Sequence, residues 1–387
     1  MVTMTSADNA LKSVYLGVIS DQLNTAVNPL LARIRQSTAD VWGKEVRRLA
    51  RYGVNGGVGA GTEEGDLPSA AGNNYEQFVT TLKNLYGTIE ISDKAVRASE
   101  NNVGAFVNLL SAEMEGLVRS SSFNFGRMLF GDGSGVLAEV SSVSGTTVTV
   151  GSVKNIVEGM VVDFLDEGSA VSGAEGRRIL SVDRDNKTFT VSGGTLTGVD
   201  EGAQVCVQGS YNLELTGLGA IFKTTGSLYG IDRATHKWMI PYIKTSVGAI
   251  TETAIQTAID RLEETAGSRV DFIVCSWGVK RALQKLFSES KRNTDVMELE
   301  GGYRTISYNG IPVVADRFCP DGTMYLLNTQ DFCLHQLCDW KWLEGDDGRV
   351  LKQVAGKRVY TATLVKYADL ICTRPCGQAM LSGITEA

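Results

Sequence analysis

Histidine and proline are both scarce in this sequence, and each shortage limits what the chain can do. The 387 residues include two histidines, His236 and His335, so acid–base catalysis at neutral pH has few candidate groups. Six prolines stand against 43 glycines, so most bends are made by flexible glycine rather than by rigid proline. We therefore expect a chain with many glycine turns and no enzyme activity.

Long apolar runs and an excess of positive charge are also missing. No apolar run reaches the roughly 18 residues that a membrane span needs, so no membrane partner is predicted. The first residues lack the basic-then-apolar pattern of a signal peptide. The net charge of −7 argues against a protein whose main task is to grip nucleic acid, because phosphate contacts require clustered Lys and Arg.

Seven cysteines, an odd number without the spacing of a disulfide framework, indicate reduced thiols in a cytoplasmic setting. Cys333, His335 and Cys338 have the residue types of a zinc site, but strand alternation puts Cys338 off the face that the other two share. Cys275 with His335 as its base is a second arrangement, a thiol nucleophile. Buried free cysteine more often packs as a small apolar side chain. We predict no catalytic residue, no metal and no cofactor, with a metal- or thiol-dependent enzyme as a distant alternative.

The longest regular pattern predicts a strand followed by a very long helix. Residues 86–92 alternate polar and apolar side chains, which is typical of a strand. From Val103 to Leu129 the apolar residues recur at spacings of three and four, so they share one stripe of a helix. Asn101 or Asn102 can cap its start, and Phe130 precedes a glycine-rich end. Such a helix spans on the order of 40 Å, and we interpret it as a spine.

Residues 41–91, ahead of this helix, predict a long hairpin that projects as an arm. Between its limbs, residues 55–74 have no apolar period, and loops of that length are normally functional or mobile. We interpret the loop as the tip of an arm that reaches another subunit; a disordered surface loop is the alternative. One limb carries a small basic patch of Arg47, Arg48 and Arg51, and the tip carries Glu63, Glu64 and Asp66. Pairing between this patch and another arm's tip is as favoured as solvation of both.

The N-terminal residues predict a helix capped by Ser6 and, after a break at Asn28, a short apolar peg that begins Pro29, Leu30, Leu31. A terminal arm of this kind is expected to be poorly buried by its own domain. We therefore predict that the peg contacts a neighbouring subunit.

Two further regions follow the spine helix. Residues 140–210 hold five short β-rich segments separated by Gly, Asp, Asn and Ser, which predicts an inserted small barrel or sandwich. Beyond residue 245 the pattern alternates helices and strands, with helices predicted at 250–266 and 279–287. Asn309-Gly310 between two alternating runs is a strong hairpin signal.

The order of these parts resembles the major capsid proteins of tailed bacteriophages, which have the Hong Kong 97-type fold. The resemblance covers essentially the whole chain. Its most telling segments are residues 28–34 (NPLLARI), 63–68 (EEGDLP), 85–99 (LYGTIEISDKAVRAS) and 126–138 (GRMLFGDGSGVLA). The family implies an α+β fold, and the all-β insertion is similar to accessory domains that some such coats carry on their outer surface.

The resemblance implies a division of the chain into named domains. These are an N-terminal arm (1–41), an E-loop hairpin (42–92), a P domain with the spine helix (93–139), an inserted β-barrel-like domain (140–210), a return to the P domain (211–235), an A domain (236–350) and a C-terminal sheet shared by the P and A domains (351–387).

The resemblance also implies a structural function. Copies of the chain would form pentamers and hexamers, and these an icosahedral head around double-stranded DNA, with the E-loop lying across a neighbour's P domain. The implied partners are a separate scaffolding protein, a portal, decoration proteins, and packaged DNA without sequence-specific contact. The implied location is the virion capsid, assembled in the host bacterial cytoplasm. An encapsulin-type compartment shell, which shares the fold, is the alternative.

Three glycines in the predicted spine, Gly104, Gly116 and Gly126, each cost a helix about 1 kcal/mol relative to alanine. Close approach of another backbone, or a bend that changes during shell maturation, would explain why they are retained.

Overall fold

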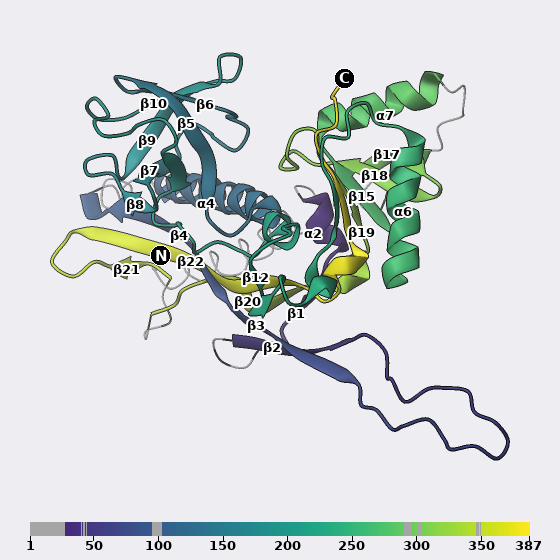
Figure 1. Ribbon diagram of the computed structural model, residues 1–387. Helices are drawn as coiled ribbons and strands as arrows, with labels where there is room; N and C mark the ends of the chain where they lie inside the picture. The colour runs from purple at the N-terminus through teal and green to yellow at the C-terminus, as the bar shows by residue number, and fades with distance from the viewer. Residues whose placement is uncertain are drawn as a thin grey trace.

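The computed structural model describes residues 28–387 except 40, 42, 44, 95–102, 290–295, 300–302, 346–347 and 349. The helix predicted after Ser6 and the caps predicted at Asn101 and Asn102 lie outside these residues. Figure 1 shows two lobes, a β-barrel and a domain of mixed helices and strands, and an arm that extends away from both. No helix among the described residues is long and apolar enough to cross a membrane.

A long helix and a five-stranded sheet form the centre of the molecule. The helix is α4 (Val103–Phe130), so the predicted spine is confirmed with its C-terminal end at the expected residue. The strand order of the sheet is β1 (Arg35–Ser37), β20 (Phe332–Trp342), β22 (Val359–Cys372) and β21 (Lys352–Gln353), and β4 (Lys83–Ser92) also pairs with β22. At Gly87 of β4 an added Cβ would meet Leu117 of α4 at 2.9 Å, so a glycine lets the helix lie close on this strand.

The predicted insertion is a closed barrel with its own core. Its strands are β5 (Val136–Ser144), β6 (Thr147–Val150), β7 (Val161–Asp166), β8 (Ser169–Ala170), β9 (Arg177–Asp183), β10 (Thr188–Val191) and β11 (Gln204–Val207). The pairing runs β11-β5-β6-β10-β9-β7, and β7 pairs back with β11 to close the ring. Its buried side chains, such as Phe164 and Phe189, form a hydrophobic cluster separate from the rest of the molecule. Residues 136–144 were not predicted as a strand.

The second lobe is a seven-stranded mixed sheet with two helices. The order is β14 (Tyr242–Lys244), β23 (Ala379–Leu381), β19 (Met324–Leu327), β15 (Phe272–Cys275), β18 (Ile311–Ala315), β17 (Tyr303–Tyr308) and β16 (Val296–Leu299). Its helices are α6 (Glu252–Ala266), capped by Thr251, and α7 (Trp277–Glu289). Asn309 and Gly310 have φ of 50° and 79°, so the predicted tight hairpin turn is confirmed.

Short elements complete the chain. They are α2 (Pro29–Arg33), α5 (Leu218–Ile221), β12 (Ser227–Leu228), β13 (Ile231–Asp232) and the 3-10 turns η2 (Lys237–Met239), η3 (Thr329–Asp331) and η4 (Pro375–Gly377).

Two sequence-based boundaries need correction. The arm consists of β2 (Glu45–Tyr52) paired with β3 (Asn74–Thr81), while β4, which we had placed in the same limb, pairs with β22 instead. Strand β20, which we had placed with the 236–350 domain, lies in the five-stranded sheet beside the same β22. Both errors have one cause: β22 is long enough to hold two neighbours, and its partners are far away in the sequence.

Buried Asp316, in the loop after β18, gives the second lobe a pH-dependent stability. Its side chain is 2% exposed; Oδ1 accepts the Phe318 N–H at 2.9 Å, and Oδ2 has no partner in the described part of the chain. Burial raises the pKa of this carboxyl from 3.8 to about 6. The folded state thus favours the neutral form, so stability from this group is complete below pH 3.8 and is lost as the pH rises through about 6.

Asp316→Asn is therefore expected to flatten part of the pH dependence of folding. Between about pH 4 and pH 7 the wild type should lose on the order of 3 kcal/mol more than the variant, since one pKa unit is worth about 1.4 kcal/mol. Urea unfolding at four pH values measures the difference. Exposed Asp200→Asn is the control and should keep the wild-type slope. Equal slopes for the wild type and Asp316→Asn would refute the assignment.

Candidate subunit-contact surfaces

The tip of the arm is the most exposed part of the described chain. Residues 53–73 are exposed at every position except Gly57. Three apolar residues are among them, and their exposed fractions are 84% for Val54, 88% for Val58 and 90% for Leu67. Covering such side chains stabilises an assembly by about 1.5–3 kcal/mol each. The tip thus gains little from its own chain and offers apolar area to another molecule.

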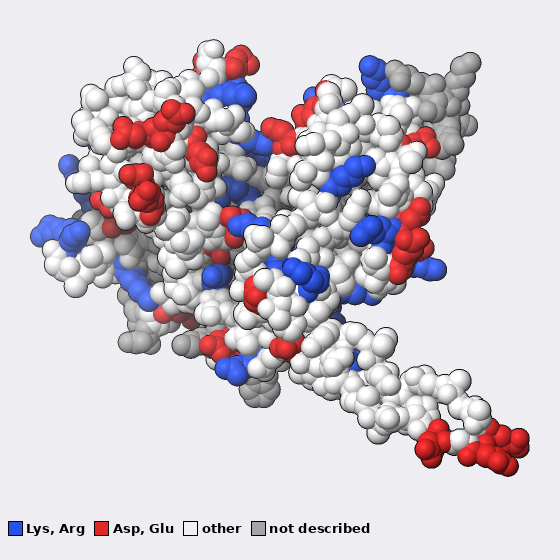
Figure 2. Space-filling model, in the orientation of Figure 1, with Lys and Arg blue, Asp and Glu red and all other residues white. Residues whose placement is uncertain are grey.

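The arm also carries opposite charges at its two ends. The basic patch predicted on the first limb lies on β2, where Arg47, Arg48 and Arg51 are all exposed. Arg47 pairs with Glu45 of the same strand at 3.1 Å. The acidic residues Glu63, Glu64 and Asp66 are exposed at the tip, where Figure 2 shows a red cluster at the far end of the arm. A second copy can therefore meet either charge with its opposite.

Aromatic stacking holds the paired strands of the arm on the body. The Tyr52 ring lies parallel to Trp238, with centroids 5.1 Å apart and planes 9° apart. Phe78 of β3 contacts the same indole at 6.0 Å and Tyr229 at 5.6 Å. The Tyr229 hydroxyl donates to the Leu370 carbonyl of β22 at 3.0 Å. This cluster of Tyr52, Phe78, Tyr229 and Trp238, here called the aromatic base, connects the arm to the central sheet.

Hydrogen bonds at the end of β3 add to this anchor. The Thr80 hydroxyl donates to Asp369 at 2.5 Å, and the Val79 N–H donates to the Tyr229 carbonyl at 3.0 Å. Asp369 also accepts from the Thr216 N–H at 2.8 Å. Burial raises the pKa of the Asp369 carboxyl, and these donors oppose that rise. The paired strands of the arm are thus held on the body along their length, and the tip loop extends from them without such contacts.

A groove of about 560 Å³ lies on the central body between α4, β4 and the segment that leaves the barrel. Apolar side chains dominate part of its lining: Leu85, Leu117, Phe125, Met128 and Trp340. Two exposed apolar residues, Tyr86 and Leu213, line it as well, each 60% exposed. Lys83 supplies a positive charge. The groove is suited to a partner segment with apolar side chains and negative charge.

Comparison with known proteins bears on this architecture. Residues 204–347 match the family described as SU10 major capsid protein. A capsid subunit of cyanophage A-1(L) superposes with a TM-score of 0.59 at 15% sequence identity, over 93% of each chain. The fold is that of Hong Kong 97-type capsid proteins.

Two further solved structures align more distantly. An encapsulin complex from Synechococcus elongatus aligns with a TM-score of 0.47 and 11% identity over 95% of each chain. Mycobacterium phage Bobi aligns with a TM-score of 0.47 and 8% identity over 100% of each chain. No curated protein matches the sequence. The family match and the capsid fold confirm the predicted resemblance to tailed-phage major capsid proteins.

Within this capsid fold, the residues of the predicted N-terminal peg are not on the surface. Leu30 and Leu31 are 0% and 2% exposed and belong to the central core; Pro29 is half-buried. The expectation that this chain would bury them poorly was wrong. The short helix α2 packs inward because Gly126 of α4 leaves room for Asn28 beside it. The charged candidates on the arm remain predictions of subunit contact.

Of the residues considered for chemistry, His335, Cys333 and Cys275 are buried in the capsid fold, and Cys338 is not. His335 is fully buried on β20 opposite Asp369, and Cys333 is 5% exposed on the same strand. A β-bulge between Gln336 and Cys338 shifts Cys338 to a half-exposed position. Among the described residues, no group of three His, Cys, Asp or Glu side chains could hold a metal ion.

Cys275 lies in the other sheet, away from His335. Its thiol is fully buried and donates to the Val314 carbonyl at 3.7 Å. Burial raises the pKa of this thiol to about 12, which disfavours the thiolate that a nucleophile needs. The arrangement considered from the sequence is therefore unsuited to thiol catalysis.

Sequence reasoning missed the groove and the aromatic base. The groove is lined by β4 and α4, which precede the barrel in the sequence, and by residues 207–214, which follow most of it. Trp238 and Tyr229 lie in a stretch with little regular structure, and no periodic pattern marks them as the partners of Tyr52 and Phe78. Their one available signal was the gathering of aromatic residues in an otherwise polar segment.

Proposed function

We propose that this chain is the major capsid protein of a tailed phage, whose copies assemble into pentamers and hexamers and then into an icosahedral head around double-stranded DNA. The observation that carries the proposal is the exposed arm on a capsid fold. A hairpin whose tip buries almost nothing on its own chain gains its stability from neighbours. The match of residues 204–347 to a major capsid protein family supports the same conclusion.

The contact we propose is between one subunit's arm and the groove of a neighbour. The tip offers Val58 and Leu67 together with carboxylates, and the groove offers apolar side chains together with Lys83. Apolar burial would supply most of the affinity, and the unlike charges would select the register. The basic patch on β2 of a neighbour is a second surface to which the acidic tip could bind through ion pairs. A separate scaffolding protein, a portal and decoration proteins would be further partners.

The net charge of −7 suits a shell that encloses DNA without binding it tightly. Tight non-specific binding of the shell to DNA phosphates would hinder packaging of the DNA. Assembly in the host cytoplasm and incorporation into the virion follow from this role.

Removal of the arm tip tests the assembly proposal. Tyr52 and Asn74 lie directly opposite each other, so an Asn-Gly turn can replace residues 53–73 and close the hairpin. The shortened chain should fold with wild-type thermal stability, because the tip contributes little to the core. It should form no closed shells when imaged by electron microscopy, whereas the full chain, with scaffold if required, should form them.

The matched control neutralises only the charge at the tip, by Glu63→Gln, Glu64→Gln and Asp66→Asn. This variant should assemble with a weakened dependence on salt. Normal shells from the shortened chain would exclude the arm as the connecting element. A full-length chain that stays monomeric under all assembly conditions would refute the function itself. Nucleic acid content of shells from infected cells separates a phage head from a shell with protein cargo.

A further inference from the structure

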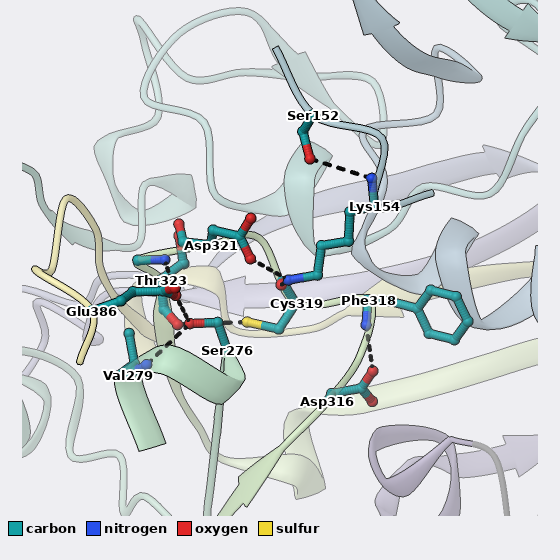
Figure 3. Close-up of polar contacts among 11 residues, drawn as sticks. Ser152, Lys154, Ser276, Val279, Asp316, Phe318, Cys319, Asp321, Thr323 and Glu386 are labelled. Atoms are coloured by element: carbon teal, nitrogen blue, oxygen red, sulfur yellow. Dashed lines mark hydrogen bonds and ion pairs between the residues drawn. The ribbon is translucent and has the colours of Figure 1, made fainter. Parts of the chain in front are cut away.

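The hydrogen bonds and the ion pair that join the two lobes in the described part of the chain all lie at one loop, residues 316–323, and one lysine of the barrel makes them. Figure 3 shows Lys154 reaching from its barrel loop toward Cys319 and Asp321. Its ammonium group donates to the Cys319 carbonyl at 2.6 Å and pairs with the Asp321 carboxylate at 2.5 Å. Residues 136–209 are all described, and no other hydrogen bond or ion pair joins them to the seven-stranded domain within the described chain.

The loop that receives Lys154 is itself firmly held. Phe318 packs on α4, where its ring meets Phe123 edge-on at 5.2 Å and lies against Gly126. The Gly322 N–H donates to Glu386 at 2.7 Å. The Cys319 thiol donates to the Thr323 carbonyl at 3.5 Å, as Figure 3 also shows. Lys154 is therefore attached to a fixed point rather than to a mobile surface loop.

The barrel, by contrast, has few attachments. Its core is separate, and its two chain connections both lie near the C-terminal end of α4, at residues 131–135 and 210–214. The contacts there, such as the Asn212 N–H to the Ser134 carbonyl at 2.8 Å, join the two connections to each other. A body attached along one edge can pivot about that edge. A second point of attachment at a distance from that edge prevents the body from pivoting.

The charges around Lys154 favour the contact. Its side chain is 24% exposed, so the ammonium is partly withdrawn from water, while Asp321 is 62% exposed. The buried carboxylate of Asp316 is a second negative group near this lysine. The neighbouring Arg317 is turned away onto the rings of Phe123 and Phe318, at 4.9 and 5.2 Å, and does not take the place of Lys154.

We propose that Lys154 is a positioning residue that locks the inserted barrel to the seven-stranded domain, so that the two lobes keep one relative orientation. The lock acts within a single subunit. It deepens the proposed function in one respect, because subunits with a fixed orientation of their outer barrels present one surface to their neighbours and to decoration proteins.

The test measures orientation in the isolated full-length chain, so it is independent of shell formation. Spin labels on unnatural amino acids at Glu201 of the barrel and Glu264 of α6, both exposed, report the distance between the lobes. The wild type should give one narrow distribution. Lys154→Met, which keeps the apolar stem but removes the charge and the donors, should broaden it at least twofold.

Three further variants make the outcome specific. Arg184→Met removes an exposed positive charge elsewhere on the barrel and should leave the distribution narrow. Lys154→Arg keeps the charge and should restore the narrow distribution. Asp321→Asn retains the bond to the Cys319 carbonyl and should give intermediate breadth. Thermal unfolding confirms that each variant is folded. A narrow distribution in folded Lys154→Met, or a broad one in the wild type, would overturn the proposal even if shells assemble normally.

Discussion

Replacing Gly126 with alanine should severely destabilise the chain, whereas the same change at Gly116, ten residues earlier on the same helix, should stabilise it. A Cβ at position 126 would lie 2.2 Å from Oδ1 of Asn28 and 2.4 Å from a ring carbon of Phe318. Both neighbours are buried, at 1% and 3% exposure, so neither has room to move. Over-packing of this kind costs about 1–3 kcal/mol or more, and here it also separates α2 and the loop at 316–323 from α4.

At Gly116 an added Cβ would meet no atom within 4 Å, and the position is exposed. The change should therefore gain up to about 1 kcal/mol from helix propensity. Denaturant unfolding of the two variants beside the wild type measures both effects. Gly126→Ala with wild-type stability would show that α2 and Phe318 do not pack as described.

The pair also refines the interpretation of these glycines. For Gly126 the close approach comes from side chains of the same chain, not from another backbone. For Gly116 a contact with a neighbouring subunit stays a prediction. This predicted contact would be distinguished from a purely local effect on the helix if Gly116→Ala raises the stability of the monomer but blocks shell formation.

Removing one partner of the buried ion pair between Arg127 and Glu214 should cost about 3–5 kcal/mol. Both side chains are 4% exposed, and the guanidinium donates to the two carboxylate oxygens at 2.9 and 2.5 Å. This pair joins the last turn of α4 to the chain that returns from the barrel. Arg127→Met or Glu214→Leu alone would leave the other charge buried without its partner.

The double variant Arg127→Met with Glu214→Leu should lose much less than the sum of the single losses, since apolar pairs often replace buried ion pairs at little cost. Urea unfolding of the four proteins forms a double-mutant cycle. Lys223→Met is the control, because its pair with Asp132 is half exposed and should be worth less than about 1 kcal/mol. Single losses as small as the control's would mean that water reaches the Arg127–Glu214 pair.

Local patterns predicted the elements, because those patterns follow from the chain's own geometry. The apolar stripe of α4 recurs every three to four residues, and the helix ends at Phe130 as expected. The Asn309-Gly310 turn needs positive φ at both positions, and these residue types tolerate it. The barrel was visible as short β-rich segments between turn residues. For the candidate site, the same reasoning identified the exposed, charged arm.

Long-range pairing was beyond this reasoning. Thr88 of β4 and Thr363 of β22 lie opposite each other, although they are 275 residues apart in the sequence. No pattern in either segment indicates that it pairs with the other. The same limit hid the groove and the placement of β20. The peg at Leu30 was misjudged for a related reason: an apolar terminal segment reads the same whether it packs on a neighbour or on its own chain. Gly126, whose missing side chain lets α2 pack against α4, lies far from Leu30 in the sequence.

The aromatic base has a mechanical consequence. Tyr52 is the last residue of β2 and pairs with Asn74, the first residue of β3, so its stacking on Trp238 holds the two strands on the body up to the point where the tip loop begins. Residues 53–73 extend from that point almost wholly exposed, so this loop can change its direction without disturbing the paired strands. For the proposed shell subunit, a change in the direction of the tip loop would thus absorb the unequal distances between neighbours in a closed shell, and neither lobe would have to repack its core.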